Sequence, residues 1–251
     1  AQSTITLHIK EMENYFNQSL FDRSGKIVHP TSFGKELYHR TKKLTNDYHS
    51  ILDMSTQNEP TGILRIGAHA SIINYRLQDF ILKYNLLYPK VDIVLQHGAS
   101  SDLRKLVQTG NLDFCFELQS QIQYPNLQTE PLHEECFSLI LPKDSTLDIL
   151  NDYNKTIYSL ETGTASREIF TDFLKSHDIS HYHTIETSSV DLIKNYVSAG
   201  FGFALLPKIT IGNDKASKNN FEIIDIEIPE IFYLQLVFQK ETHLTPSMKT
   251  F

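Results

Sequence analysis

The chain has 251 residues, of which 40% are hydrophobic and 21% are charged. This composition excludes a globally disordered protein and suits one large domain or two small ones. No apolar run approaches the roughly 18 residues that span a bilayer, and the chain opens with charged amphipathic sequence rather than an apolar signal peptide. Two cysteines, Cys115 and Cys136, cannot form a disulfide framework. We therefore expect a soluble cytoplasmic protein without a membrane partner.

The net charge of −7 is unevenly distributed along the chain. Residues 1–43 carry seven Lys and Arg against four Asp and Glu, whereas residues 44–251 carry 16 against 26. A basic head can approach a polyanion such as DNA, whereas an acidic body is repelled by phosphates. The sequence therefore predicts that only the N-terminal head approaches nucleic acid.

The head begins with a predicted helix. Apolar side chains recur at helical spacing in residues 4–16, and Asn17 is a residue type that tolerates the left-handed conformation at a helix end. A turn at Ser24-Gly25-Lys26 and a short extended segment follow. Thr31 is suited to cap a second helix, which we expect to run from Lys35 to Met54.

The second helix carries an apolar seam with heptad spacing. The seam consists of Leu37, Thr41, Leu44, Tyr48 and Ile51. An ordinary amphipathic helix packed on its own domain would give a similar pattern, but the length and the polar remainder of this helix favour pairing with a partner helix. Residues 55–62, which are polar and include Pro60 and Gly62, are predicted to form a linker.

From Ile63 onward, strands alternate with helices. The first predicted elements are a strand at 63–67, a helix at 71–88, a strand at 91–95, a helix at 101–109 and a strand at 112–116. Further strands are predicted at 136–141, 157–160, 184–187, 203–207 and 233–238, with helices at 166–176, 190–198 and after Thr245. Such alternation indicates parallel crossovers and an α/β fold.

Two separate regions carry recognisable motifs. The first is AQSTITLHIKEMENYFNQSLFDRSGK followed by TSFGKELYHRTKKL, and the second is IKNYVSAGFGFALLP, preceded far upstream by LRIGAHASIINYRLQDFILKYNLLYP. In this order they resemble the recognition helix, L-F-x-R, wing, T-x-x-G and V-x-x-G-x-G-x-x-x-L-P motifs of LysR-type transcriptional regulators. The first helix of that family and most of its second have no counterpart before Ala1, so we expect a partial winged helix-turn-helix.

The resemblance implies an α/β protein with a defined domain order. A partial winged helix-turn-helix DNA-binding domain would occupy 1–34, a dimerisation helix and hinge 35–60, and a two-lobed effector-binding domain resembling type 2 periplasmic binding proteins 61–251. Lobe I would comprise about 61–134 and 208–251, and lobe II about 135–207. The implied function is sequence-specific regulation of transcription, controlled by a small anionic metabolite bound between the lobes.

The implied partners are a double-stranded DNA operator and further copies of the chain, as a homodimer or homotetramer. RNA polymerase is a further candidate partner. A recognition helix reads base edges with residues near its N-terminus, while the wing contacts phosphates. The candidate DNA contacts are Gln2, Ser3, Thr4, Thr6, His8 and Lys10 in the helix, and Arg23 and Lys26 around the wing. A solvated polar face would give the same pattern, and Arg23 could instead hold the wing to the helix through Glu13.

Ligands of α/β folds bind beyond the carboxyl ends of strands, where this sequence predicts three hydroxyl-rich helix starts. Helix N-termini offer free N–H groups and partial positive charge to an anion, although each Ser or Thr alone could serve only as an N-cap. A nearby histidine would add a tunable donor. The candidate effector residues are His69, Ala70, Ser71, Ser100, Ser101, Thr162 and Thr164.

Other chemistries receive less support from the sequence. The spacing of His177, His181 and His183 could bind a metal, but a loop is the simpler interpretation, and a Cys115–Cys136 disulfide would require close Cα atoms. No G-x-S-x-G, Walker or H-E-x-x-H motif occurs, so we expect no enzyme, metal or cofactor. The alternative function is a solute-binding module without DNA binding, which would leave the basic head unexplained.

Overall fold

The computed structural model describes residues 2–23, 28–53, 60–151, 156–212, 220–240 and 244–251. The chain forms two compact units, residues 1–59 and residues 60–251 apart from the short turn 109–111. Residues 55–59 of the linker predicted at 55–62 lie outside the described residues. Among the described residues, no helix combines the length and the apolar character needed to cross a membrane.

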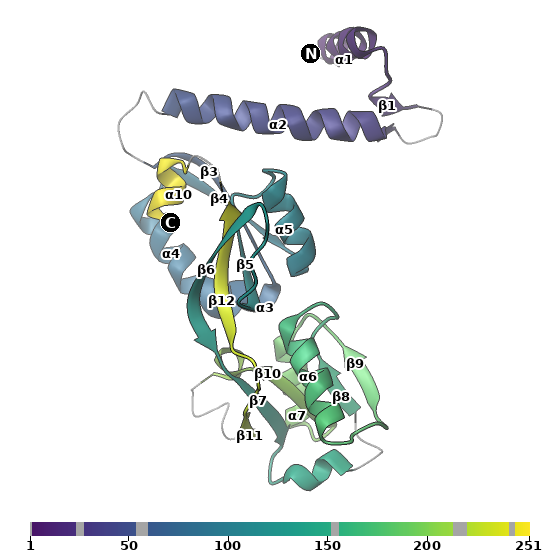
Figure 1. Ribbon diagram of the computed structural model, residues 1–251, viewed down its shortest axis with the longest axis vertical. Helices are drawn as coiled ribbons and strands as arrows, with labels where there is room; N and C mark the ends of the chain where they lie inside the picture. Colours follow the sequence, from purple (N-terminus) through teal and green to yellow (C-terminus); the bar gives the residue numbers. More distant parts are fainter. Residues whose placement is uncertain (1, 24–27, 54–59, 152–155, 213–219, 241–243) are drawn as a thin grey trace. The chain divides into compact units, whose positions relative to one another are not determined.

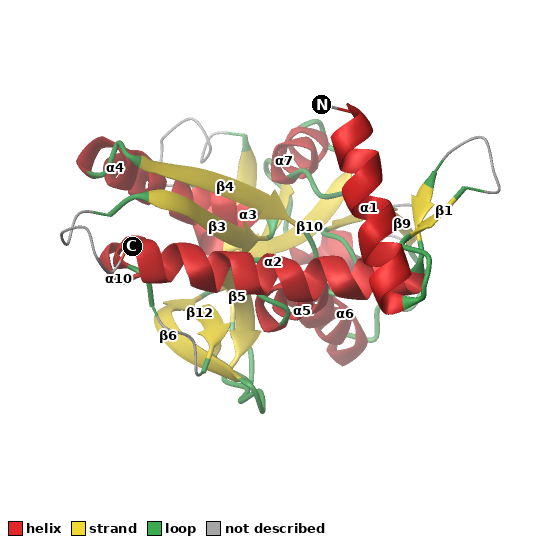
Figure 2. Ribbon diagram, turned by 90° about the horizontal axis from the view of Figure 1, so that it is seen from above, coloured by secondary structure: helices red, strands yellow, loops and turns green. Residues whose placement is uncertain are grey.

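The N-terminal unit consists of two helices and a two-stranded ribbon (Figures 1 and 2). The elements are α1 (Gln2–Phe16), β1 (Phe21–Asp22), β2 (His29–Pro30) and α2 (Ser32–Asp53). Asn17 ends α1 with a φ of 51°, as its residue type predicted. Thr31 caps α2 as predicted, because its Oγ1 accepts a hydrogen bond from the Gly34 amide at 2.9 Å. The cap places the start of α2 at Ser32, three residues before the predicted Lys35.

A glycine permits the close approach of α2 to the wing. A Cβ on Gly34 would lie 2.1 Å from the carbonyl oxygen of Leu20, a distance that no side chain can occupy. Leu20 is buried there, and the Thr31 hydroxyl donates to the Ser19 carbonyl at 2.7 Å. The wing is therefore fixed to the first turn of α2 by backbone contact.

Lobe I contains a five-stranded mixed sheet with helices on both faces (Figure 1). The strand order is β4-β3-β5-β12-β6, with β3 (Gly62–Ala68), β4 (Val91–His97), β5 (Phe114–Ser120), β6 (Leu127–Glu135) and β12 (Phe232–Gln239). Strand β3 is parallel to β4 and β5, as the alternating pattern predicted, whereas β12 is antiparallel to β5 and β6. The helical elements are α3 (Ala70–Ile72), the π-helical turn η1 (Ile73–Leu77), α4 (Gln78–Leu87), α5 (Ser100–Gln108) and α10 (Pro246–Thr250).

The two faces of this sheet have separate apolar layers. On one face, Tyr84 of α4 and Met248 of α10 belong to a core with Leu64 and Ile66 of β3. On the other face, α5 contributes Leu103 and Val107 to a second core. Burial of these apolar side chains is what fixes the helices on the sheet.

A buried polar network lies on the α5 face. The Glu117 side chain is fully buried and forms a short hydrogen-bonded ion pair with Arg104 of α5. The same carboxylate accepts hydrogen bonds from the Tyr124 hydroxyl at 3.2 Å and from Gln235 Nε2 at 2.8 Å. A buried carboxylate is tolerated when it is paired and hydrogen-bonded in this way.

Lobe II contains the second five-stranded mixed sheet, in the order β11-β7-β10-β8-β9. The strands are β7 (Phe137–Pro142), β8 (Thr156–Ser159), β9 (His183–Glu186), β10 (Gly202–Pro207) and β11 (Phe221–Ile226). The helices are the 3-10 helix η2 (Leu147–Asn151), α6 (Ala165–Ser176), α7 (Val190–Ser198) and α8 (Lys208–Ile211). Helix α6 packs on one face and α7 on the other.

The motif glycine Gly202 allows β10 to pair closely with β8, because a Cβ there would lie 1.9 Å from the Thr156 carbonyl oxygen.

The predicted lobe boundary is wrong at its C-terminal side. We assigned residues 208–251 to lobe I, but β11 pairs with β7 over Phe221–Ile226 and so belongs to the lobe II sheet. The chain therefore crosses between the lobes twice, once between β6 and β7 at Cys136 and once through residues 227–231 between β11 and β12. Strands β6 and β11 were absent from the predicted elements altogether.

Candidate functional site

His69 is the central residue of the predicted effector site. It follows β3 directly and caps α3, with the Ser71 amide donating to Nδ1 at 3.4 Å and the Ser71 hydroxyl 2.9 Å from the same atom. Because Nδ1 accepts from an N–H group, the neutral ring carries its proton on Nε2. The Nε2 atom is buried and has no hydrogen-bond partner among the described residues. His69 therefore has an unused donor inside the protein.

Burial lowers the pKa of His69 below 6.5, although the Glu161 carboxylate acts in the opposite direction and His97 adds to the lowering. The ring is thus mainly neutral at pH 7. A neutral donor can bind an anion without the desolvation cost of a buried charge.

Glu161 of lobe II faces this donor. Its Oε2 lies 3.6 Å from His69 Nε2, which is an ion-pair distance but longer than a normal hydrogen bond. Two of the predicted helix starts, one from each lobe, therefore meet, and a carboxylate of the protein itself lies opposite the free donor. The arrangement can accept a carboxylate or another oxyanion only when Glu161 moves away.

A second glutamate occupies the start of α6. Glu186, at the end of β9, accepts hydrogen bonds from both the amide and the hydroxyl of Thr162, each at 3.0 Å. These bonds lower the pKa of Glu186. Thr164 caps α6 by accepting from the Arg167 amide, and its own hydroxyl donates to the Glu161 carbonyl. The hydroxyl groups of Thr162 and Thr164, which were predicted to receive an anion, are therefore already hydrogen-bonded within the protein.

The predicted helix start at Ser100 and Ser101 lies at the same end of the lobe I sheet as the one at His69, namely at the carboxyl ends of the parallel strands. Ala68 pairs with His97 at the ends of the parallel strands β3 and β4, so the starts of α3 and α5 leave that end of the sheet together. Ala70 is the first residue of α3, and Ser100 and Ser101 open α5. The described hydrogen bonds of His69 involve Ser71 and neither of these serines, so Ser100 and Ser101 share that end of the sheet with His69 without bonding to it.

The space beside Ser71 is small in this structure. A cavity of about 20 Å³, lined also by Arg76, Glu135 and Thr210, opens between the lobes. This volume is near that of a single water molecule and is far below the size of a metabolite site. Binding of a metabolite there therefore requires the lobes or the Glu161 side chain to move.

Further contacts between the lobes were missed by the sequence analysis. The Tyr75 hydroxyl donates to Asp191 Oδ1 of α7 at 2.7 Å, and Lys194 lies over the Tyr75 ring at 5.1 Å from its centroid. Within lobe I, Arg76 donates to the buried Glu135 at 2.6 Å, next to the crossover at Cys136. Of the residues in these contacts and in the His69–Glu161 contact, only Glu161 could be anticipated from the sequence, because it follows the end of a predicted strand and directly precedes Thr162.

The candidate DNA-binding residues lie in the N-terminal unit. Thr4, Thr6, His8 and Lys10 are exposed on α1, whereas the side chains of Gln2 and Ser3, although part of that helix, and Lys26 lie outside the described residues. His8 lies 3.2 Å from Glu11. Arg23 Nη2 is 3.8 Å from Glu13 Oε2, and Glu13 also accepts from the Leu20 amide at 2.8 Å. The alternative interpretation of Arg23, as a link between wing and helix, agrees with this contact.

The predicted dimerisation residues lie along α2. Leu44 and Tyr48 are 72% and 58% exposed, an unusual state for large apolar side chains on one helix seam. Leu37 is half-buried, and Thr41 donates to the Leu37 carbonyl at 2.8 Å. The side chain of Ile51, within α2, is outside the described part of the structure.

The cysteines and histidines form no described metal centre. Among the residues that the structure describes, no group of three or more His, Cys, Asp or Glu side chains could hold a metal ion. Cys115 is buried in β5, and burial raises the pKa of its thiol to about 12, whereas Cys136 is exposed. A thiol with such a raised pKa is unreactive near neutral pH.

Comparison with known proteins identifies the family. A family model described as the LysR substrate binding domain matches residues 57–251. An uncharacterized helix-turn-helix transcriptional regulator of Bacillus subtilis, YwqM, is 29% identical over 261 residues, covering 100% of this chain and 88% of that protein. The transcriptional regulator CzcR of Bacillus anthracis is 25% identical and covers 100% of this chain and 86% of that protein.

Solved structures show the same fold. A full-length OxyR variant from Pseudomonas aeruginosa aligns over 100% of this chain and 83% of its own, with a TM-score of 0.76 and 21% identity. HinK, a LysR family regulator from Pseudomonas aeruginosa, aligns over 100% and 86% with a TM-score of 0.59 and 19% identity. The predicted resemblance is confirmed, and the alternative of a solute-binding module without a DNA-binding head is not favoured. The chain belongs to the LysR substrate-binding domain family of transcriptional regulators.

Proposed function

We propose that this regulator responds to a small anionic metabolite that binds between lobes I and II beside His69. The observation that carries the proposal is the buried Nε2–H of His69, which has no acceptor among the described residues and faces lobe II. A buried donor without an acceptor costs about 1–3 kcal/mol, and a ligand oxygen would recover that cost.

The proposed ligand competes with the protein's own carboxylates. An anionic group of the metabolite would replace Glu161 opposite His69, and displacement of Glu186 would free the Thr162 amide and hydroxyl. The ligand would then stabilise one relative arrangement of the lobes over another, through its differential affinity for the two states.

The N-terminal unit would deliver this change to DNA in the cytoplasm. We place the exposed face of α1 in the major groove and the β1–β2 wing on the phosphate backbone. The exposed seam of α2 would pair with α2 of a second copy, which brings two heads to one operator. Exposed Leu82 and Leu86 of α4 would contribute a further apolar surface to such an assembly, whether homodimer or homotetramer.

Calorimetry with a panel of small carboxylates, inorganic oxyanions and zwitterionic amino acids tests the effector site. We expect an anion from this panel to bind, the Ser71→Ala/Thr162→Ala double variant to lose the binding, and Glu161→Gln to strengthen it by removing a competing carboxylate. Glu134→Gln, which alters an exposed carboxylate of β6, is the matched control. Undiminished binding by the double variant, or weaker binding by Glu161→Gln, would remove the assignment.

A further inference from the structure

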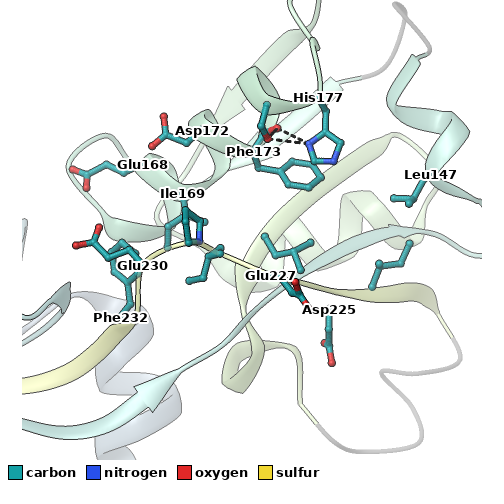
Figure 3. A pocket seen from close by; sticks show the side chains of 15 residues that line it. Leu147, Glu168, Ile169, Asp172, Phe173, His177, Asp225, Glu227, Glu230 and Phe232 are labelled. Atoms are coloured by element: carbon teal, nitrogen blue, oxygen red, sulfur yellow. Dashed lines mark hydrogen bonds between the residues drawn. The ribbon is translucent and has the colours of Figure 1, made fainter.

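Lobe II contains a second, larger pocket on the side of α6. It has a volume of about 560 Å³ and lies between α6, η2, the end of β11 and the 227–231 crossover (Figure 3). This volume is within the range of roughly 300–1,000 Å³ that is typical of small-molecule sites. The cavity beside Ser71, by comparison, has only about 20 Å³. The larger pocket therefore has room for a small molecule without movement of the lobes.

The floor of this pocket is apolar. It is formed by Leu147, Ile169, Phe173, Ile224, Ile226, Ile228 and Phe232. Ile169 and Phe232 are each 7% exposed and belong to the core of lobe II, so the pocket is an opening into that core. A hydrocarbon or aromatic group would bury apolar surface there at about 25 cal/mol per Å².

Carboxylates line the rim. They are Glu168, Asp172, Asp225, Glu227 and Glu230, and no lysine or arginine is among the described lining residues. Asp172 is paired with Lys175 at 3.2 Å, and Asp225 forms a short ion pair with Lys208.

The other three carboxylates, those of Glu168, Glu227 and Glu230, form no ion pair within the described part of the chain. In Figure 3, Glu168 and Glu230 lie on the same side of the pocket. The rim therefore has uncompensated negative charge above an apolar floor.

We propose that this pocket binds a small hydrophobic cation, such as an aryl- or alkylammonium compound. The apolar floor accepts the hydrocarbon part, and the free rim carboxylates bind the ammonium group through charge-assisted hydrogen bonds. An anion of the same shape is repelled by the rim. The ligand class is therefore opposite in charge to the one proposed for the His69 site, and neither assignment depends on the other.

The position of the pocket connects its occupancy to the geometry of the lobes. Ile228, Pro229 and Glu230 line the pocket and also belong to the 227–231 crossover, one of the two connections between lobe II and lobe I. A bound cation would restrict the conformations of this connection. The site is thus placed to affect how the lobes move.

Methyl NMR of the 251-residue chain, labelled at isoleucine methyl groups, tests the site with benzylamine, benzyl alcohol and benzoate as probes. We expect benzylamine to shift the methyl signals of Ile169, Ile224, Ile226 and Ile228 while those of lobe I stay in place. Benzyl alcohol should bind at least tenfold more weakly, and benzoate should cause no shift. Equal affinity for benzoate, or benzylamine shifts elsewhere but not at these four residues, would overturn the proposal.

Variants that remove charges from the rim distinguish the contribution of the rim carboxylates to binding from that of the apolar floor. Glu168→Gln/Glu230→Gln should weaken benzylamine binding about tenfold, the effect of one charged hydrogen bond, and leave benzyl alcohol binding unchanged. The exposed pair on β6, Glu130→Gln/Glu134→Gln, removes the same charge outside the pocket and should leave both affinities unchanged. An unchanged benzylamine affinity in the rim variant would contradict the proposed role of the carboxylates.

Discussion

The Tyr75 hydroxyl of lobe I donates a hydrogen bond of 2.7 Å to Asp191 of lobe II. Lys194 approaches both groups, at 3.3 Å from the Tyr75 hydroxyl and 3.2 Å from the Asp191 carboxylate. The hydrogen bond from Tyr75 lowers the pKa of Asp191, and burial together with this bond raises the pKa of Tyr75. This polar triad fastens the lobes at a place separate from the two chain crossovers.

Tyr75→Phe should loosen the contact between the lobes. Because the Asp191 carboxylate is largely exposed, the loss in the free energy of unfolding should be small, about 0.5 kcal/mol. Hydrogen exchange should nevertheless quicken at the start of α7 and at η1, where the two partners lie. Tyr88→Phe, which removes a hydroxyl elsewhere in lobe I, serves as the control. Identical exchange in Tyr75→Phe and the unaltered chain would show that the triad does not hold the lobes.

Arg104→Ala should destabilise the protein strongly. It leaves the fully buried Glu117 carboxylate without its cation, a change that costs about 3–5 kcal/mol in comparable buried pairs. Lys105→Ala is the matched control on the next residue of α5, because its ion pair with Asp102 is exposed and should contribute less than about 1 kcal/mol. Urea denaturation measures both. Equal losses in the two variants would mean that Glu117 is stabilised without Arg104.

Leu44→Asp should weaken self-association. It places a charge in the exposed seam of α2, where a partner helix would have to desolvate it. Sedimentation velocity should show a shift towards the monomer, with the circular dichroism spectrum unchanged. Lys35→Gln, at the start of the same helix and off the seam, makes the same change of one unit in net charge and serves as the control. A wild-type mass distribution in Leu44→Asp would argue against pairing through α2.

The His69 site should destabilise the fold as the solution becomes acidic. Because burial lowers the pKa of His69, the unfolded chain binds a proton at a higher pH than the folded chain does. The contribution of His69 to the free energy of unfolding is therefore present above about pH 6.5, the pKa of histidine in an unfolded chain. It is lost as the pH falls through the lower pKa that His69 has in the folded protein. His69→Gln should lose less free energy of unfolding between pH 7.5 and pH 5 than the unaltered chain. The exposed His133→Gln provides the comparison, and an equal loss in His69→Gln and the unaltered chain would count against this account.

Local patterns predicted most elements of the fold. Helix α7 lies at the predicted residues 190–198, because apolar spacing and the Ser189 cap agree there. Strand β6 was missed because Pro131 interrupts it and most of its side chains are exposed, as befits an edge strand. Strand β11 pairs with β7 across about 80 residues of sequence, and such a long-range pairing leaves no local signal.

The site was predicted only in its local parts. The capping roles of His69 and Thr164 follow from their positions after strands. The pairing of Thr162 with Glu186 could not be predicted, because it depends on β8 and β9 lying side by side, with Ser159 opposite Glu186. The amide and hydroxyl of Thr162, which were expected to be free for a ligand, are thus bonded to a carboxylate from elsewhere in the sequence.

Strand β12 occupies an interior position in lobe I, between β5 and β6, yet it comes almost last in the chain. During synthesis, the ribosome must therefore release all of lobe II before the lobe I sheet can be completed. Until then β6 has no neighbour, since β12 is its sole partner in the described sheet. Lobe II can thus assemble on the growing chain while lobe I waits for residues 232–239, and a nascent chain that ends before them exposes an unfinished sheet edge.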